Sequence, residues 1–290
     1  MPLEKVSPCK VNLLLNVLGR RPDGFHELET VLHPVNVFDE LTIERVGSGV
    51  VLSCSDPNLP TDGRNLIHRA ATTFLQTAKI SDGVKIRLEK RIPLAAGLGG
   101  GSGNTAVTLL ALNELFGHPL SGVKLNELAG AIGSDVSFFL QTRPALATGR
   151  GEKIQPLDLF PAFEGKAFLL IHPGFGISTP WAYQNLAHFP EALSGKSGRA
   201  VRLIANLQTH NWSTIGQSFY NSLEAPAFNK FPILELYQEC LLENGALAAL
   251  MSGSGSTTFA VVENVARGKS LEEKFKSRFG DNCWTAVVAI

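Results

Sequence analysis

Residues 93–104, PLAAGLGGGSGN, form the segment of this sequence best suited to binding an anion. Four of the five residues from Gly99 to Gly103 are glycines, and the segment lies between an expected strand and an expected helix. Glycine lets the backbone curl so that successive N–H groups point inward, and the first turn of a helix adds N–H groups that have no intrahelical acceptor. Phosphate is the usual ligand of such an arrangement. The segment therefore predicts a phosphate-binding loop rather than a flexible linker.

Two common phosphate loops fit this segment poorly. A Walker loop has a lysine after its glycines, and no lysine follows here. A dinucleotide-binding fingerprint is matched formally by residues 101–106. The preceding strand, however, carries Lys85 and Arg87 on one face, and the acid expected about 20 residues later would be Glu127, inside a predicted helix. An NAD-dependent enzyme is therefore only a distant alternative.

A second glycine loop occupies residues 251–256, MSGSGS, between two apolar runs. One interpretation is an ordinary tight hairpin, since glycine supplies the backbone angles that such turns need. The other is that this loop lies beside the first and wraps the same anion.

Three further polar residues have the chemistry of a site. Lys10 and Asn12 share one face of a strand that is otherwise very apolar, and Asp135 follows Gly133 and Ser134. Lys10 and Asn12 are either a solvated face or a functional one, and Asp135 is either the N-cap of a short helix or a functional carboxylate. The histidines show no metal-ligand spacing, and the basic pairs at 20–21 and 90–91 are interpreted as solvated faces.

Periodicity of the apolar residues predicts the elements that position these groups. The first part of the chain suggests an antiparallel meander. Its expected elements are a strand at 10–17, a turn at 21–24, an extended stretch through about Val37 and a strand at 41–46. The later elements are expected as helices at 65–78, 105–116, 124–132, 180–189, 200–208, 231–244 and 269–279, and as strands at 84–91, 167–173 and 285–290, with a strand–turn–strand unit at 246–263. A Pro-containing stretch at 154–165 is the expected domain boundary, which gives domains at 1–158 and 159–290.

Composition limits the class of protein. The chain has 290 residues, 44% of them hydrophobic, and 26 basic residues balance 26 acidic ones, so the net charge is zero. This balance disfavours binding to long nucleic acids, which is usually the work of basic proteins. No apolar run is long enough to span a bilayer, the N-terminal segment shows no signal-peptide core, and the four cysteines form no CxxC pair. We expect a reduced cytoplasmic protein with no nucleic acid or membrane partner, either a monomer or a homodimer.

Several motifs in order along the chain resemble those of the GHMP kinases, a family of small-molecule kinases. The glycine segment resembles the phosphate loop of this family, and its GLGGGS form resembles a branch whose substrate is a methylerythritol unit that carries cytidine diphosphate. The other matching stretches are SPCKVNLLL from Ser7, RPDGFH from Arg21, RNLI from Arg64, GSDVSFF from Gly133, HPGFGIST from His172 and SGSG from Ser252. Together they extend over residues 7–262, nearly the whole chain.

This resemblance implies an α+β fold of two domains. The N-terminal domain would be like the second domain of ribosomal protein S5, and the C-terminal domain would be ferredoxin-like. The implied reaction is the transfer of the γ-phosphate of ATP, with Mg²⁺, to the 2-hydroxyl of the methylerythritol unit in the non-mevalonate isoprenoid pathway. The residues implied to bind ATP are Asn65, Leu66, Gly97, Leu98, Gly99, Gly100, Gly101, Ser102, Gly103 and Asn104.

The resemblance also implies a catalytic pair and a substrate site. Asp135 would accept the proton of the hydroxyl, and Lys10 would keep Asp135 ionised and stabilise the transferred charge. Asn12 would orient the sugar alcohol, Phe25 and His26 would hold the cytosine, and Thr179 would close over the substrate. No metal ligand is assigned.

Several positions depart from the pattern of this branch, and two of them concern the site. Gly103 replaces a serine, which we expect to remove a hydroxyl near the phosphates, and Phe25 replaces a tyrosine, which keeps a stacking face and loses a polar group. The alternatives are a kinase of this family for another alcohol, such as mevalonate or homoserine, and a catalytically silent binding protein on the same fold. The Phe25–His26 pair disfavours the first, and the retained Lys10 and Asp135 disfavour the second.

Overall fold

The computed structural model describes residues 2–290, which form two compact units. Unit 1 comprises residues 2–9, Val37–Ile92 and Gly99–Thr142, and unit 2 comprises Lys10–Asn36, Pro93–Leu98 and Arg143–Ile290. Strands β1 (Leu3–Arg20) and β2 (His26–Val46) contribute residues to both units. Because the units consist of interleaved segments of the chain, they do not coincide with two consecutive halves, and the boundary at 158/159 stays a prediction.

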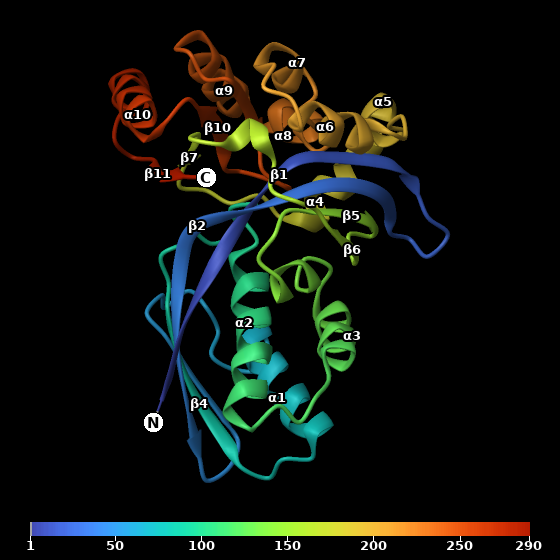
Figure 1. The fold of residues 1–290 in the computed structure, drawn as a ribbon, viewed down its shortest axis with the longest axis vertical. Helices are drawn as coiled ribbons and strands as arrows, with labels where there is room; N and C mark the ends of the chain where they lie inside the picture. The colour runs from blue at the N-terminus through green and yellow to red at the C-terminus, as the bar shows by residue number, and fades with distance from the viewer. Residues whose placement is uncertain (1) are drawn as a thin grey trace. The chain divides into compact units, whose positions relative to one another are not determined.

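Unit 1 contains four neighbouring strands in the order β3-β4-β2-β1, covered by helices. Strand β4 (Gly83–Glu89) pairs antiparallel with Glu40–Val46 of β2 and parallel with β3 (Val50–Cys54). Helix α1 (Leu66–Ala78) packs against α2 (Gly100–Leu115) and α3 (Gly122–Ile132), as Figure 1 shows. A short 3-10 helix, η1 (Ser137–Leu140), follows α3.

Helix α1 follows directly from its sequence. The side chain of Asn65 accepts a hydrogen bond from the N–H of Ile67 at 2.9 Å and caps the first turn. The buried residues recur three and four positions apart along one face, which packs into the core: Ile67, Ala70, Ala71, Phe74 and Leu75. The helix ends at Lys79, which adopts a left-handed conformation with φ of 55°. This helix confirms the prediction at 65–78.

Helix α2 begins earlier than the sequence predicts. We expected it to start near Thr105, whereas it starts at Gly100, with Gly99 as the left-handed N-cap at φ of 69°. The glycines were expected to form a loop because glycine disfavours helix interiors. They form the first helical turn instead, where N–H groups have no intrahelical acceptors.

A buried ion pair lies beside this turn. The Asp39 carboxylate is fully buried and accepts hydrogen bonds from the Lys90 ammonium, the Nδ2 of Asn104 at 3.0 Å and the backbone N–H groups of Arg91 and Ile92. The prediction that residues 90–91 form a solvated face is therefore wrong for Lys90, whose side chain is buried. It holds for Arg91, whose guanidinium pairs with Glu40 at the surface.

In unit 2, a turn joins the two long strands as predicted. The N–H of Arg21 donates to the carbonyl of Phe25 at 2.7 Å, and Gly24 adopts a φ of +85°. Residues of β2 pair antiparallel with β5 (Ala145–Gly149), which pairs with β6 (Lys153–Pro156), and β1 pairs parallel with β8 (Tyr220–Asn221). The second extended segment is longer than expected, because β2 runs without interruption through residue 46.

The second sheet of unit 2 has the strand order β11-β7-β10-β9. Its strands are β7 (Ala167–His172), β9 (Ala248–Met251), β10 (Thr258–Val262) and β11 (Trp284–Ala289). With α9 (Ile233–Glu243) between β7 and β9 and α10 (Val265–Phe279) between β10 and β11, the connection is the β-α-β-β-α-β of ferredoxin-like domains. Strands β7 and β10 are buried throughout, which agrees with their continuous apolar sequences.

Shorter helices complete unit 2. They are η2 (Pro161–Phe163), α4 (Thr179–Asn185), η3 (Leu186–His188), α5 (Pro190–Leu193), α6 (Arg199–Leu207), α7 (Trp212–Gln217) and α8 (Glu224–Lys230). The polar segment before α6 is anchored, because the N–H of Gly195 donates to the carbonyl of Val17 at 2.8 Å and Asn16 donates to the carbonyl of Lys196 at 2.9 Å. None of the helices within residues 2–290 has both the length and the apolar character needed to cross a membrane.

The buried pair in unit 1 predicts a large effect of one substitution. Asp39→Ala should lower the free energy of unfolding by about 3–5 kcal/mol, because it leaves the Lys90 ammonium buried without its counter-charge. Urea denaturation followed by circular dichroism measures this change.

The neighbouring surface pair supplies the matched control. Glu40→Ala removes a carboxylate whose partner, Arg91, is exposed, and we expect a change of less than about 1 kcal/mol. Equal losses in the two variants would show that the buried pair has no special role.

Candidate active site

Lys10 lies at the centre of the candidate site residues in unit 2. Its side chain is buried, with 3% of the residue exposed, and its ammonium donates to the carbonyl oxygen of Gly97 at 2.6 Å and to the Oδ1 of Asn12. Asn12 is also buried, and its Nδ2 donates to the Oγ1 of Thr30 at 2.8 Å. Of the two interpretations left open by the sequence, the solvated face is therefore wrong. The strand presents a buried, organised polar face.

The late glycine loop packs directly on the first one. The Oγ of Ser252 donates to the carbonyl of Gly97 at 3.0 Å, and the N–H of Thr257 donates to the carbonyl of Ala96 at 3.1 Å. Gly97 has a φ of +76°, and a Cβ placed on it would lie 2.0 Å from the carbonyl oxygen of Ser252. Glycine is therefore required at position 97 by both backbone conformation and close approach.

The late loop is a β9–β10 hairpin whose serine hydroxyls all contact other protein groups. Ser252 bonds Gly97, Ser254 shares a hydrogen bond with Thr179 at 2.8 Å, and Ser256 donates to the carbonyl of Phe175. The loop is buried from residue 252 to 257. These contacts make it a scaffold that holds residues 96–97 in place and links them to the predicted substrate residue Thr179.

In unit 1, the glycines form the first turn of α2, at the end of the helix where N–H groups have no intrahelical acceptor. The N–H groups of Gly100, Gly101 and Ser102 lie in this turn, and the first bond of the turn runs from the N–H of Gly103 to the carbonyl of Gly99 at 2.9 Å. The positive end of the helix dipole adds to the attraction of a phosphate. The side chain of Asn104 is 2% exposed and is bound to Asp39, so it anchors this turn.

The structure corrects the expectation about Gly103. A Cβ at this position would lie 2.6 Å from the carbonyl oxygen of Pro8 and 3.0 Å from the Oγ of Ser7, so position 103 faces strand β1. The Oγ of Ser7 is buried and has no hydrogen-bond partner within residues 2–290. The replacement of serine by glycine therefore changes a contact between α2 and β1, whereas we had expected it to remove a hydroxyl near the phosphates.

Two further residues predicted to bind the nucleotide, Asn65 and Leu66, lie in unit 1. The amide of Asn65 caps α1 through its oxygen and donates to the carbonyl of Pro60 at 2.8 Å through its nitrogen. Its side chain is thus committed to holding the start of the helix, and Leu66, half-buried, is the first helical residue.

Aromatic and basic side chains gather around the turn of unit 2. Phe25 is 52% exposed, and the guanidinium of Arg150 lies over its ring at 4.7 Å. His26 stacks on Tyr183 of α4, with ring centroids 5.0 Å apart. Burial, with a contribution from Arg20, lowers the pKa of His26, so its imidazole is neutral at pH 7. Arg150 and Tyr183 were not predicted, because they lie more than 100 residues from the turn in sequence.

Asp135 lies in unit 1, in the turn that precedes η1. The N-cap of η1 is Val136, so the interpretation of Asp135 as that N-cap is wrong. The predicted site residues thus divide between the units: Lys10, Asn12, Phe25, His26, Gly97, Leu98 and Thr179 belong to unit 2, and the others to unit 1.

Two buried titratable groups support the late loop. Burial raises the pKa of Glu224 to about 7, although its carboxylate accepts hydrogen bonds from the N–H of Met251 at 2.8 Å and from Gln238. Burial also lowers the pKa of His172 to about 4, and its Nδ1 lies 3.3 Å from the Oγ of Ser256. Both groups contact the hairpin that carries the loop.

Comparison with known families places this geometry in context. Residues 65–143 match the family model described as GHMP kinases N terminal domain, and residues 203–281 match the one described as GHMP kinases C terminal. Fold and site thus define a small-molecule kinase with an α+β fold of two domains, as predicted. The chain belongs to the GHMP kinase family.

Relatives and solved structures agree with this placement. The 4-diphosphocytidyl-2-C-methyl-D-erythritol kinase of Synechococcus sp. (strain JA-3-3Ab) is 37% identical over 279 residues, which cover 94% of this chain and 89% of that protein. The protein of the same name from Syntrophotalea carbinolica is 36% identical over 95% of both chains. A crystal structure of 4-(cytidine 5'-diphospho)-2C-methyl-D-erythritol kinase superposes with a TM-score of 0.82 at 36% identity, and covers 99% of this chain and 100% of the other.

A more distant structure shares the fold alone. Homoserine kinase from Cytophaga hutchinsonii has a TM-score of 0.75 at 23% identity, and covers 99% of this chain and 93% of that one.

The contact between the two loops predicts that Gly97→Ala is disruptive. The new methyl group must displace the Ser252 carbonyl and hold a left-handed backbone, so the free energy of unfolding should fall by roughly 1–3 kcal/mol or more. Thermal and urea denaturation measure the loss. Gly101→Ala is the control, because no atom lies within 4 Å of its added Cβ. Similar stability of the two variants would contradict the proposed close approach.

The raised pKa of Glu224 predicts a pH-dependent stability. The contribution of Glu224 to the free energy of unfolding is fully present below the ordinary carboxyl pKa of about 4.5. It is lost as the pH rises through about 7, because in this range the folded state keeps the proton that the unfolded state has released. Relative to Glu224→Gln, the wild-type chain should therefore lose unfolding free energy between pH 5 and pH 8, by a few kcal/mol at most. Urea denaturation of both proteins at the two pH values checks this, and a difference independent of pH would contradict it.

Proposed function

We propose that this protein transfers the γ-phosphoryl group of ATP to the 2-hydroxyl of 4-diphosphocytidyl-2-C-methyl-D-erythritol. The observation that carries the proposal is the similarity, over 94–95% of the chain, to relatives that bear the name of this kinase. The crystal structure that bears the same kinase name covers 99% of this chain.

The nucleotide phosphates are assigned to the glycine segment. Backbone N–H groups of residues 99–102 and the N-terminal end of α2 favour negative charge without requiring several basic side chains. The adenine is assigned to the start of α1, at Asn65 and Leu66. Because the Asn65 side chain already caps that helix, the backbone is the group that remains for a nucleotide contact there.

The cytidine diphosphate group is assigned to the aromatic residues of the turn. An exposed phenylalanine ring stacks well on a pyrimidine, and Phe25 is held in place by the turn and by Arg150. The neutral imidazole of His26 has one nitrogen that donates and one that accepts, which suits the hydrogen-bonding edge of cytosine. Its ring orientation is fixed by the stacking on Tyr183. We assign Thr179, at the start of α4, to the substrate as well.

Phosphoryl transfer requires positioned groups and stabilised charge. Asp135 accepts the proton of the 2-hydroxyl as its oxygen forms a bond to the γ-phosphorus, and the bond from that phosphorus to ADP breaks. Lys10 supplies positive charge, and its hydrogen bonds to Gly97 and Asn12 help to orient the ammonium. Asn12 orients the acceptor alcohol.

Mg²⁺ is the metal that we propose. Within residues 2–290, no group of three or more histidine, cysteine, aspartate or glutamate side chains is arranged to hold a metal ion by itself. This fits a Mg²⁺ ion bound mostly through nucleotide phosphates and water, for which Ser102 has a suitable oxygen. When bound, the ion neutralises charge on the phosphates. A cytoplasmic location and a monomeric or homodimeric state stay predictions.

Incubation with ATP, Mg²⁺ and the cytidine diphosphate substrate should add one phosphate, detected by mass spectrometry. Asp135→Asn should lower kcat by two orders of magnitude or more, since it removes the base and keeps the side-chain shape. Circular dichroism and the unfolding midpoint establish that the variant is folded.

A panel of acceptors tests the substrate. Mevalonate and homoserine, under the same conditions, should give no phosphorylated product. Preference for an acceptor that lacks cytidine would overturn the proposed substrate, and near-normal kcat in Asp135→Asn would overturn the assignment of the base.

A further inference from the structure

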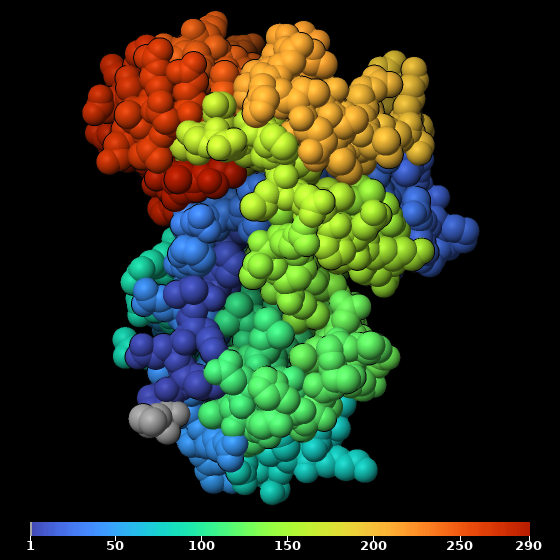
Figure 2. Space-filling view, in the orientation of Figure 1, coloured from blue at the N-terminus to red at the C-terminus, as the bar shows by residue number. Residues whose placement is uncertain are grey.

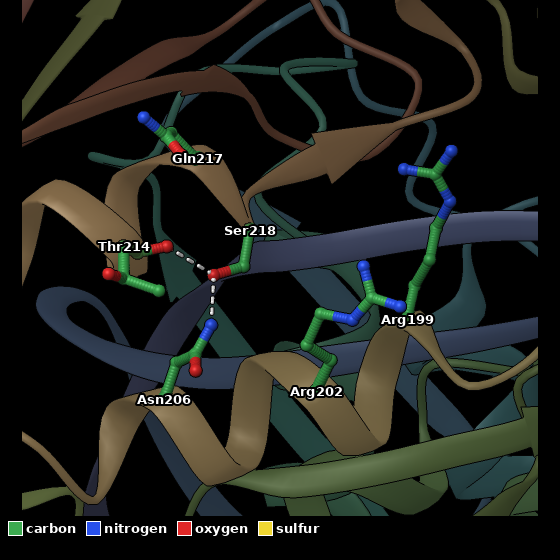
Figure 3. Close-up of a pocket in the computed structure, with 6 residues that line it drawn as sticks. All are labelled: Arg199, Arg202, Asn206, Thr214, Gln217 and Ser218. Atoms are coloured by element: carbon green, nitrogen blue, oxygen red, sulfur yellow. Dashed lines mark hydrogen bonds between the residues drawn. The ribbon is translucent and has the colours of Figure 1, made fainter.

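A polar cavity lies between α6 and α7 in unit 2, outside the residues assigned to the kinase reaction. Its volume is about 250 Å³. Six residues line it: Arg199, Arg202 and Asn206 on α6, Thr214 and Gln217 on α7, and Ser218 just after α7. Figure 3 shows the two arginines extending from α6 beside Asn206, with the other three residues across from them. The segments that carry them, coloured light orange, reach the surface in Figure 2.

The polar face of α6 explains this arrangement. Positions 199, 202 and 206 are three and four residues apart, so they share one side of the helix. The adjacent side carries the apolar residues that anchor α6 in the protein: Ala200, Leu203 and Leu207. Core packing of the adjacent side therefore leaves both arginines on the side of α6 that lines the cavity, and Figure 3 shows the guanidinium of Arg202 turned toward Arg199.

The cavity is positively charged and has no internal counter-charge. No acidic residue lines it, and within residues 2–290 neither Arg199 nor Arg202 forms an ion pair with a carboxylate. Like charges three residues apart on a helix repel each other. The Nε of Arg199 is in addition buried without a hydrogen-bond partner in that part of the chain. A buried donor of this kind is costly unless a ligand or water satisfies it.

The walls of the cavity are held in place by other contacts. The guanidinium of Arg199 lies 3.9 Å from the ring centroid of Tyr220. The Oγ of Ser218 accepts a hydrogen bond from the Nδ2 of Asn206 at 2.8 Å and bonds the carbonyl of Thr214 at 2.8 Å, which ties α6 to α7. A site with such fixed donors loses little conformational freedom when a ligand binds.

We propose that this cavity binds the phosphate or diphosphate group of a small molecule. The planar guanidinium group matches two oxygens of a phosphate, and two such groups on one helix face suit a multiply charged anion. The hydroxyl of Thr214 and the amide of Gln217 supply further donors. The volume is below the usual range for drug-sized ligands, which favours a phosphate or diphosphate head group over a whole nucleotide.

Isothermal titration calorimetry with inorganic pyrophosphate tests the proposal. The full-length chain is first saturated with ADP without divalent metal, so that the nucleotide site is occupied. Pyrophosphate should then bind at one site, more weakly at 300 mM than at 50 mM salt. Arg202→Gln should weaken this binding roughly tenfold or more, because it removes a charge-assisted donor.

Arg267→Gln is the matched control. It removes the same charge from an exposed position on α10, and we expect wild-type affinity for pyrophosphate. Absence of binding to the ADP-saturated wild-type chain, or equal affinity in the two variants, would overturn the proposal. Turnover with the kinase substrates, measured for Arg202→Gln in parallel, should be unchanged. The kinase assignment and the anion site are therefore tested separately.

Discussion

The carbonyl oxygen of Gly97 is the point on which the arrangement of unit 2 depends. It accepts hydrogen bonds from the ammonium of Lys10 and from the hydroxyl of Ser252, two groups that lie far apart in sequence. Only a glycine allows the loop to approach Ser252 closely enough for both bonds. The same contact fixes the ammonium of Lys10 and the end of the late loop, which in turn bonds Thr179 through Ser254.

Each unit contains a buried lysine, and the two are held in different ways. Lys90 is paired with the carboxylate of Asp39, which also binds Asn104 and so fixes the first turn of α2. The Asp39–Lys90 pair therefore holds the start of α2 in place. Lys10 donates to a carbonyl and to an amide oxygen, which hold its ammonium beside the loop that carries Gly97. The burial of the Asp39–Lys90 pair agrees with a scaffold role for Lys90, whereas for Lys10 we propose a chemical role.

The predictions from sequence succeeded where local patterns determine structure. Apolar periodicity was sufficient for α1, and alternation was sufficient for β4, since each buries one face. They failed where the environment of a residue is determined by a partner that is distant in sequence. From the sequence, Lys90 was interpreted as a surface lysine, because its buried partner Asp39 lies 51 positions away. Gly103 was interpreted only as part of a phosphate loop, because its approach to Pro8 and Ser7 is visible only in the fold. Arg150 and Tyr183 belong to no motif in the sequence. Their roles follow only from the rings they contact in the fold, Phe25 for Arg150 and His26 for Tyr183.

The contact between Asn12 and Ser252 joins residues separated by 240 positions. Contacts of such long sequence separation form late, because a large loop must close before they yield any stabilisation. During synthesis, strand β1 is made first, whereas the β9–β10 hairpin is among the last parts of the chain to be made. The hydrogen bond between Asn12 and Ser252 can therefore form only late in synthesis. Completion of the late hairpin thus coincides with completion of the Lys10 environment.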